Sequence, residues 1–203
     1  MSDSVRSVAM FEAIRGLSRI FAAIDRLLLM ALIAAITLLV LANVGARSMG
    51  FTIAWADELA VYGMIMAGFV GASLMLRLRT APSVTLLHEV LPERAVRILR
   101  VLIALVAIVF AGLLLWMCWL WFDPAGLAAA GFDIRRFEGA TFNFIYTETT
   151  PVMGLPAAWF FAVMPWFALT VLVHAMTNLA EDAGMIAPPP EPPVADVNGE
   201  GAV

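Results

Sequence analysis

The fold is decided by residues 51–76, which read Phe51-Thr-Ile-Ala-Trp55-Ala-Asp57-Glu58-Leu-Ala-Val-Tyr62-Gly63-Met-Ile-Met-Ala67-Gly68-Phe-Val-Gly71-Ala72-Ser-Leu-Met-Leu76. After Glu58 no charged residue occurs until Arg77. At about 1.5 Å of rise per residue, a helix over this run and its flanks covers roughly the 30 Å thickness of the hydrocarbon layer of a bilayer. The stretch therefore predicts a membrane-spanning helix at about residues 57–76.

Small residues follow one face of this predicted helix. Gly63, Ala67 and Gly71 recur at every fourth position, and Gly68 and Ala72 form a second row beside them. Because no hydrophobic effect drives helices together in lipid, small residues that let two backbones approach closely are a main source of association. The pattern predicts a packing face, which meets either other helices of this chain or a partner protein.

Two adjacent acids, Asp57 and Glu58, begin the helix just after Trp55. Carboxylates at a helix N-terminus stabilise the helix by roughly 0.3–1 kcal/mol each. The alternative interpretation is a docking point for a cationic side chain of a neighbouring subunit. The predicted partner interface comprises Trp55, Asp57, Glu58, Gly63, Ala67, Gly68, Gly71 and Pro165.

The composition of the whole chain agrees with this reading of one stretch. Of 203 residues, 63% are hydrophobic and 14% are charged, and the mean hydropathy is +0.93. Soluble domains are about 45–50% apolar. We therefore expect an all-α integral membrane protein with four transmembrane helices, preceded by an amphipathic interfacial helix.

Uncharged runs predict the four spans at about residues 27–46, 57–76, 97–122 and 155–177, within a membrane domain of residues 27–180. Pro165 lies inside the last span, where proline kinks a helix. Residues 123–150 are predicted to form an outer loop, and residues 181–203 a disordered, acidic, proline-rich tail. A signal peptide is the competing interpretation of the first run. The apolar region of a signal peptide is only roughly 7–15 residues long, whereas residues 27–46 form a longer run that follows an amphipathic leader.

Residues 1–26 have the pattern of an amphipathic helix. Apolar residues recur at steps of three and four, while Glu12 and several arginines fall on the opposite face. Such a helix lies on a membrane surface with its cations near anionic phospholipid; the alternative is a face docked on another protein. The predicted membrane-anchoring residues are Arg15, Arg19, Arg26, Arg94, Arg97, Arg100, Trp116 and Trp119.

The arginines also predict the orientation. All twelve basic residues are arginine, and nine of them precede the first span or lie between the end of the second span and the first turns of the third. Loops rich in Arg and Lys stay in the cytoplasm. We therefore expect both termini to be cytoplasmic.

No motif in the sequence predicts catalysis or metal binding. The predicted spans hold no paired carboxylates, no Ser/His/Asp set and no group of metal ligands, and Cys118 is expected to be a small core residue. His174 is expected to be a lone interfacial residue near the cytoplasmic end of the fourth span. Because its spans hold essentially no charges between their ends, the chain lacks the equipment of a self-sufficient carrier. It is predicted to be an accessory subunit, not an enzyme, with no cofactor and no nucleic-acid partner.

Several short motifs, in this order and spacing, resemble one family. They are Trp55-Ala-Asp57-Glu58-Leu-Ala-Val-Tyr62, Gly68-Phe-Val-Gly71-Ala72-Ser, Arg77, Leu91-Pro92-Glu-Arg94, and Leu155-Pro156-Ala-Ala-Trp159 followed by Pro165. Over residues 20–180 the chain is similar to the small membrane subunit, the DctQ type, of tripartite ATP-independent periplasmic (TRAP) transporters.

The resemblance implies a bacterial inner-membrane protein that scaffolds a large DctM-type membrane subunit. That pair would import an organic acid delivered by a periplasmic binding protein, with sodium coupling in the large subunit. Two alternatives stay open. One is the small subunit of a tricarboxylate-type tripartite transporter, and the other is a stand-alone membrane channel or accessory protein.

Overall fold

The structure, a computed structural model, describes residues 2–80 and 92–186, and all its regular elements are helices. They are α1 (Ser2–Ser48), α2 (Ala54–Leu78), α4 (Glu93–Phe122), α5 (Pro124–Ala129), α6 (Ile134–Thr141), α7 (Ala158–Phe161) and α8 (Val163–Asp182). Four segments are long and apolar enough to cross a membrane: Ala9–Ser48, Ala54–Leu78, Arg94–Ala129 and Ala158–Asp182. The prediction of an all-helical protein with four membrane-spanning helices is confirmed.

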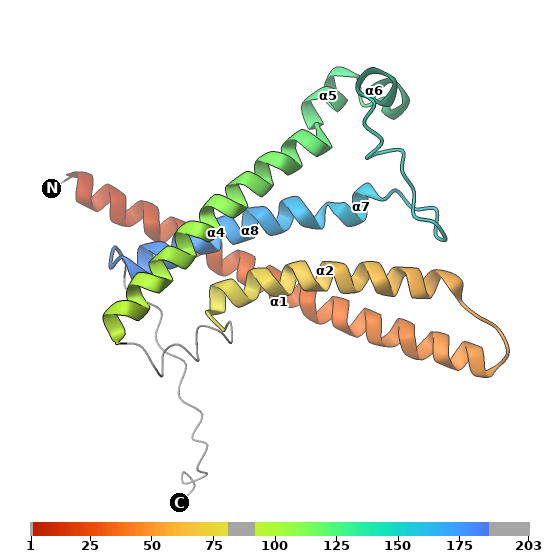
Figure 1. Ribbon diagram of the computed structural model, residues 1–203, viewed down its shortest axis with the longest axis horizontal. Coiled ribbons are helices and arrows are strands. Elements are labelled where there is room, and N and C mark those ends of the chain that lie inside the picture. The colour runs from red at the N-terminus through yellow and green to blue at the C-terminus, as the bar shows by residue number, and fades with distance from the viewer. Residues whose placement is uncertain (1, 81–91, 187–203) are drawn as a thin grey trace, which may run out of the picture.

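Helix α8 is the centre of the bundle. It packs against α1, α2 and α4, and it lies between α4 on one side and the hairpin of α1 and α2 on the other (Figure 1). In the most apolar stretch of each span, 44% of the residues of the α7–α8 segment are buried, against 6% for α1 and 11% for α4. Most of the lateral surface of α1 and α4 is therefore available to lipid or to another protein.

The predicted amphipathic segment is not a separate helix. Residues 5–26 form the first half of α1, which continues without interruption to Ser48. Within that half the buried positions are Ser18 and Asp25, whereas Leu17 and Ile24 of the expected apolar face are exposed. The face that meets α8 carries Ser18 and Asp25, seven residues apart, and also Phe21, whose ring packs against Trp166. The arginine side does not meet α8, because Arg19 and Arg26 are exposed.

The fourth span is broken at Ala162, between α7 and α8. Pro165 explains the break, because a proline ring clashes with the carbonyl four residues before it and donates no backbone hydrogen bond. The bond from the backbone N–H of Trp166 to the carbonyl of Ala162 is long, at 3.4 Å. Ala162 itself keeps a right-handed helical conformation, and Pro165 is half-buried.

The outer connection over residues 123–150 is more ordered than a loop. It contains α5 and α6, which begin at Asp123 and Asp133; each aspartate accepts backbone N–H groups of its own helix. The connection is tied to α4 by Tyr146 Oη, which donates to the carbonyl of Phe122 at 2.7 Å. A fully buried Phe137 packs against the Tyr146 ring.

The predicted tail begins too early. Glu181 and Asp182 belong to the last turn of α8, and Ile186 beyond them is buried. Both acids are bound by arginines at the end of α2: Arg77 contacts Glu181, and Arg79, just after the helix, contacts Asp182. The rest of the tail prediction, for residues 187–203, lies outside the described residues, as do the predictions for the segment of residues 81–91.

Candidate functional site

The end of α1 and the start of α2 are joined by polar contacts around Asp57. Arg47 Nη2 lies 2.6 Å from Asp57 Oδ2, and Asn43 Nδ2 donates to Asp57 Oδ1. The Asn43 side-chain oxygen in turn accepts the backbone N–H of Ile53, in the turn between the helices. Asp57 thus has a cation within its own chain, so a partner cation is not needed to explain this acid.

Glu58 connects α2 to the turn that precedes α7. Its carboxylate accepts the backbone N–H groups of Val152, at 3.1 Å, and Met153, at 2.7 Å. Trp55, one turn earlier, is half exposed and was predicted with Glu58 as a partner contact. The structure gives Glu58 a role inside the chain, in positioning the turn that leads into α7.

The glycines of α2 divide between two faces. A Cβ added at Gly63 would lie 3.0 Å from Ile36 of α1, and one added at Gly71 would lie 3.9 Å from Leu29 of α1. Gly68 is exposed, with no atom near enough to meet an added Cβ, and Ala67 is half-buried. Gly63 and Gly71 therefore seat α2 on its sister helix, whereas Gly68 faces away from the described helices.

An ion network joins the last turns of α2 and α8, at the end of the molecule that also holds the N-terminus (Figure 1). Arg77 makes two contacts with Glu181, at 3.0 and 3.1 Å, and donates to Asn178 at 2.8 Å. Arg79 bonds both Glu181 and Asp182. The Glu181 side chain is fully buried, so this network fixes the contact between the two helices.

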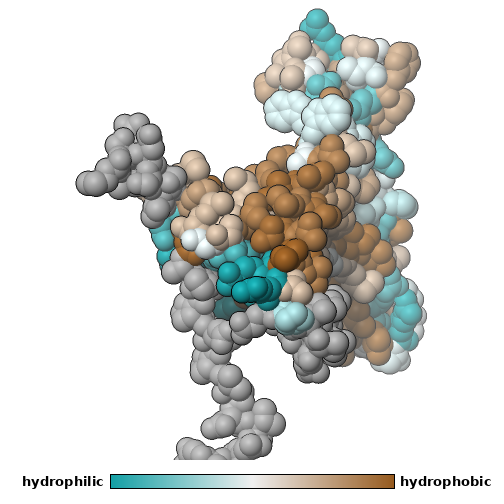
Figure 2. Space-filling view, turned by 60° about the vertical axis from the view of Figure 1, so that its left-hand side comes forward, coloured by the Kyte–Doolittle hydropathy of each residue, from teal (hydrophilic) through white to brown (hydrophobic). Residues whose placement is uncertain are grey.

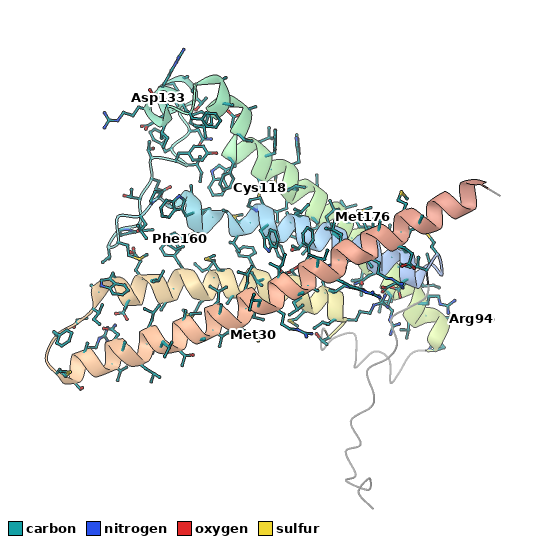
Figure 3. The ribbon with its side chains drawn as sticks, turned by 180° about the vertical axis from the view of Figure 1, so that it is seen from behind. Met30, Arg94, Cys118, Asp133, Phe160 and Met176 are labelled. Atoms are coloured by element: carbon teal, nitrogen blue, oxygen red, sulfur yellow. The ribbon has the colours of Figure 1, made fainter. Side chains whose placement is uncertain are left out.

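The residues predicted to anchor the chain in the membrane take different positions. Arg19, Arg26, Arg94 and Arg97 are exposed, and Trp116 and Trp119 are each 60% exposed. Arg94 lies at the N-terminal end of α4 (Figure 3). Arg15 is different, because it pairs with Glu12 at 2.8 Å. Arg100 is half-buried and lines a cavity of about 70 Å³ with Arg79 and Asp182.

An apolar groove of about 640 Å³ lies where α4 meets the start of α8. Cys118 is buried at its base, as expected for a small core residue, and Pro165 and two tryptophans of α4 line it. Figure 2 shows apolar side chains gathered over one face of the molecule. The groove is lined by Gly112, Leu115, Trp116, Cys118, Trp119, Phe122, Pro124 and Pro165.

The expectation that His174 is a lone interfacial residue is wrong. Its side chain is fully buried, and its Nδ1 lies 2.8 Å from Ser18 Oγ of α1. Asp25, also fully buried, lies on the other side of the ring. The spans therefore do bring a serine, a histidine and an aspartate together, which the sequence did not indicate because Ser18 and Asp25 were assigned to the membrane surface.

These observations define a class of protein. Four apolar helices cross a membrane and are joined by buried polar contacts, and the described residues contain no group of three or more His, Cys, Asp or Glu that could hold a metal ion. A family model for the DctQ component of tripartite ATP-independent periplasmic transporters matches residues 36–184. The chain belongs to this family: it is a small membrane subunit of a TRAP transporter and a multi-pass protein of the inner membrane.

The family match confirms the resemblance seen in the sequence, although it begins at residue 36, inside α1. Ser18 and Asp25 therefore lie outside the matched region, and His174 lies within it. Members of the family are transporter components. Comparison with curated proteins and with solved structures gives no match to this chain.

Proposed function

We propose that this chain is the non-catalytic scaffold for a large DctM-type carrier subunit. In this proposal the two subunits import an organic acid that a periplasmic binding protein delivers, and an ion gradient drives the import. The substrate and the coupling ion, expected to be sodium, bind to the large subunit. This chain needs no cofactor of its own.

The unequal burial of the four spans is the observation that carries the proposal. The exposed surface of α1 and α4 is apolar over most of its length, while α8 is enclosed by the other three spans. A four-helix protein that enclosed a transport path would bury its helices more evenly around that path. Two long helices with open sides are better suited to extend the surface of a larger membrane protein.

Gly68 gives the proposal a specific contact. It lies in the middle of α2, is exposed, and has room for a Cβ on every side. Glycine in a helix interior costs roughly 1 kcal/mol relative to alanine, so a packing reason is expected where it occurs. Since residues 2–80 and 92–186 supply no such reason, we assign Gly68 to a close approach by a helix of the large subunit.

The proposal is tested by purifying the tagged chain in mild detergent from its native host. Recovery of a large DctM-type membrane protein in equal amount is the expected result. In the Gly68→Leu variant we expect recovery of that protein to fall at least several-fold while the variant itself accumulates normally. Gly63→Leu is the matched control, because it changes the contact with Ile36 inside the chain and should reduce the stability of the chain itself.

Two results would count against the scaffold. The first is a stable monomer or homo-oligomer that carries no large partner. The second is solute transport in liposomes that contain only this chain, which would favour a stand-alone channel. The family match supports the DctQ assignment over the small subunit of a tricarboxylate-type transporter.

The remaining expectations belong to the same proposal. Both termini face the cytoplasm, the arginines on that side contact anionic phospholipid, and the binding protein docks only transiently. A cysteine introduced at an exposed position of α6, such as Gly139→Cys, should react with a membrane-impermeant reagent from the periplasmic side. If the Gly139→Cys variant reacted only after the membrane had been disrupted, the proposed orientation would be wrong and α6 would face the cytoplasm.

A further inference from the structure

A polar cluster is buried where the first half of α1 crosses α8. Trp166 Nε1 donates to Asp25 Oδ1 at 2.9 Å, and Ser18 Oγ lies 2.8 Å from His174 Nδ1. Between these two hydrogen bonds, His174 Nε2 faces Asp25 Oδ2 at 3.9 Å. Ser18, Asp25 and His174 are each 0% exposed.

The two facing atoms lack hydrogen-bond partners. Asp25 Oδ2 and His174 Nε2 are buried and bond no other described atom. A separation of 3.9 Å is too long for a direct hydrogen bond, whose heavy atoms lie about 2.7–3.2 Å apart. An unsatisfied buried polar atom is unfavourable, and more so when it is charged. We therefore expect a group or ion to lie between these two atoms and to satisfy both.

The charges around the pair identify what is missing. A neutral imidazole beside an ionised carboxylate would leave one uncompensated negative charge between two membrane-spanning helices, which is unfavourable. On α1 the nearest acids and bases are Glu12 and Arg15, which pair with each other, and the exposed Arg19 and Arg26. Among the described side chains, Asp25 bonds Trp166 and faces His174.

The other helices around the pair supply no countercharge. Helix α2 has no acidic or basic residue between Glu58 and Arg77, and α4 has none between Arg100 and Asp123. On α8 the next ionisable groups after His174 are Glu181 and Asp182, which already bind Arg77 and Arg79. A metal ion does not fit either, since only one carboxylate oxygen and one ring nitrogen are available and metal sites need more ligands.

We propose that Asp25 and His174 form a binding site for a single proton between α1 and α8. The proton comes from water and is held between Oδ2 and Nε2. It resides either on the ring, as an imidazolium facing a carboxylate, or on the carboxyl, which then donates to Nε2 of a neutral ring. In both forms the pair has no net charge, and the 3.9 Å gap can close to a hydrogen bond.

The bound proton has a structural role. Asp25 belongs to the part of α1 that precedes the family match, and His174 belongs to the part of α8 inside it. The site therefore stabilises the contact of this N-terminal segment with α8, at the centre of the bundle. Without the proton, the net negative charge between the helices weakens that contact.

The test uses the full chain in lipid nanodiscs, with His88→Gln so that His174 is the only imidazole. Nitrogen-15 NMR of the ring at pH 7 distinguishes three states. An imidazolium, which is protonated on both ring nitrogens, supports the site. A neutral ring protonated on Nδ1 only supports it when the carbon-13 signal of the Asp25 carboxyl shows the protonated acid, and contradicts it when that signal shows the carboxylate. A neutral ring protonated on Nε2 beside an ionised Asp25 carboxylate leaves the pair with a net negative charge, because the additional proton is absent, and this state overturns the proposal.

Two variants separate the pair from its surroundings. Asp25→Asn removes the negative charge but preserves the shape, so an imidazolium signal present in the parent chain is expected to disappear. Glu12→Gln removes an acid from the same helix outside the cluster and should leave the ring signal unchanged. An imidazolium that persists in Asp25→Asn, or one lost in Glu12→Gln, would contradict the assignment to Asp25.

Discussion

Arg77 and Glu181 form a two-contact ion pair that holds the last turn of α2 against the last turn of α8. The Glu181 side chain is fully buried, and that of Arg77 is 10% exposed. The same carboxylate also binds Arg79, which has a left-handed backbone conformation at the end of α2. Three elements of the sequence thus depend on one acid: the end of α2, the end of α8 and the residue that terminates α2.

Glu181→Gln is expected to destabilise the chain strongly. The substitution leaves Arg77 with no carboxylate partner and Arg79 with Asp182 alone, and breaking a buried ion pair costs about 3–5 kcal/mol. The measurement is thermal or denaturant unfolding in detergent. Asp57→Asn is the matched control, because its pair with Arg47 is more than half exposed and such pairs contribute about 0–1 kcal/mol. If the two variants lowered the free energy of unfolding equally, burial of the ion pair would not explain the stability that Glu181 provides.

Glu58→Ala is expected to loosen the turn before α7 and to leave α2 intact. The Glu58 carboxylate accepts two backbone N–H groups there, and a hydrogen bond to a charged group contributes about 1.5–3 kcal/mol, at the low end when solvent reaches it. Amide exchange at Val152 and Met153 should therefore become about tenfold faster or more. Unchanged exchange would show that the turn holds its shape without the cap. Glu148→Ala, an exposed acid of the same connection, serves as the control.

Several features of the fold could be predicted from the sequence. The spans could be located because a run of about twenty uncharged residues has few alternatives to a membrane helix. The packing role of Gly63 and Gly71 could also be predicted, since small residues four positions apart favour close helix contact. The sequence did not show that these two glycines meet α1 and that Gly68 does not.

The buried polar contacts were missed for a physical reason. Asp25 and His174 are far apart in the chain, and each alone looks like a residue at the edge of a span. A usable signal did exist: Ser18 and Asp25 are seven residues apart, so they share one helix face with Asn43 further along. The starts of the short helices α5 and α6 could also have been predicted. Aspartate favours the position just before a helix, where Asp123 and Asp133 lie, and proline favours the first helical position, where Pro124 lies.

Thr170→Val is expected to be more harmful than Ser73→Ala. Ser73 Oγ donates to Thr170 Oγ1, which itself donates to the carbonyl of Phe167. Removing the Thr170 hydroxyl leaves a buried donor at Ser73 without its acceptor, a loss of about 1–3 kcal/mol. Removing the Ser73 hydroxyl leaves Thr170 satisfied, so the cost should stay below about 1 kcal/mol. Unfolding free energies of the two variants test this order, and the reverse order would contradict the donor assignment.

Tyr146 gives the outer connection a dependence on alkaline pH. Burial raises the pKa of its phenol, and the nearby Asp123 carboxylate raises the pKa further. The neutral phenol is therefore favoured in the folded connection, where it donates to the carbonyl of Phe122. This contribution to stability is present below the unfolded pKa of about 10 and is lost as the pH rises through the higher folded value.

The measurement is the tyrosinate absorbance of a Tyr62→Phe variant, in which Tyr146 is the only tyrosine. We expect the phenol of the folded chain to titrate above pH 10 and the free energy of unfolding to fall over the same range. Tyr146→Phe should lack that alkaline fall, although it also lacks the hydrogen bond to Phe122 and should be less stable at neutral pH. Titration of Tyr146 at or below about pH 10 in the folded chain would show that the connection does not bury the phenol.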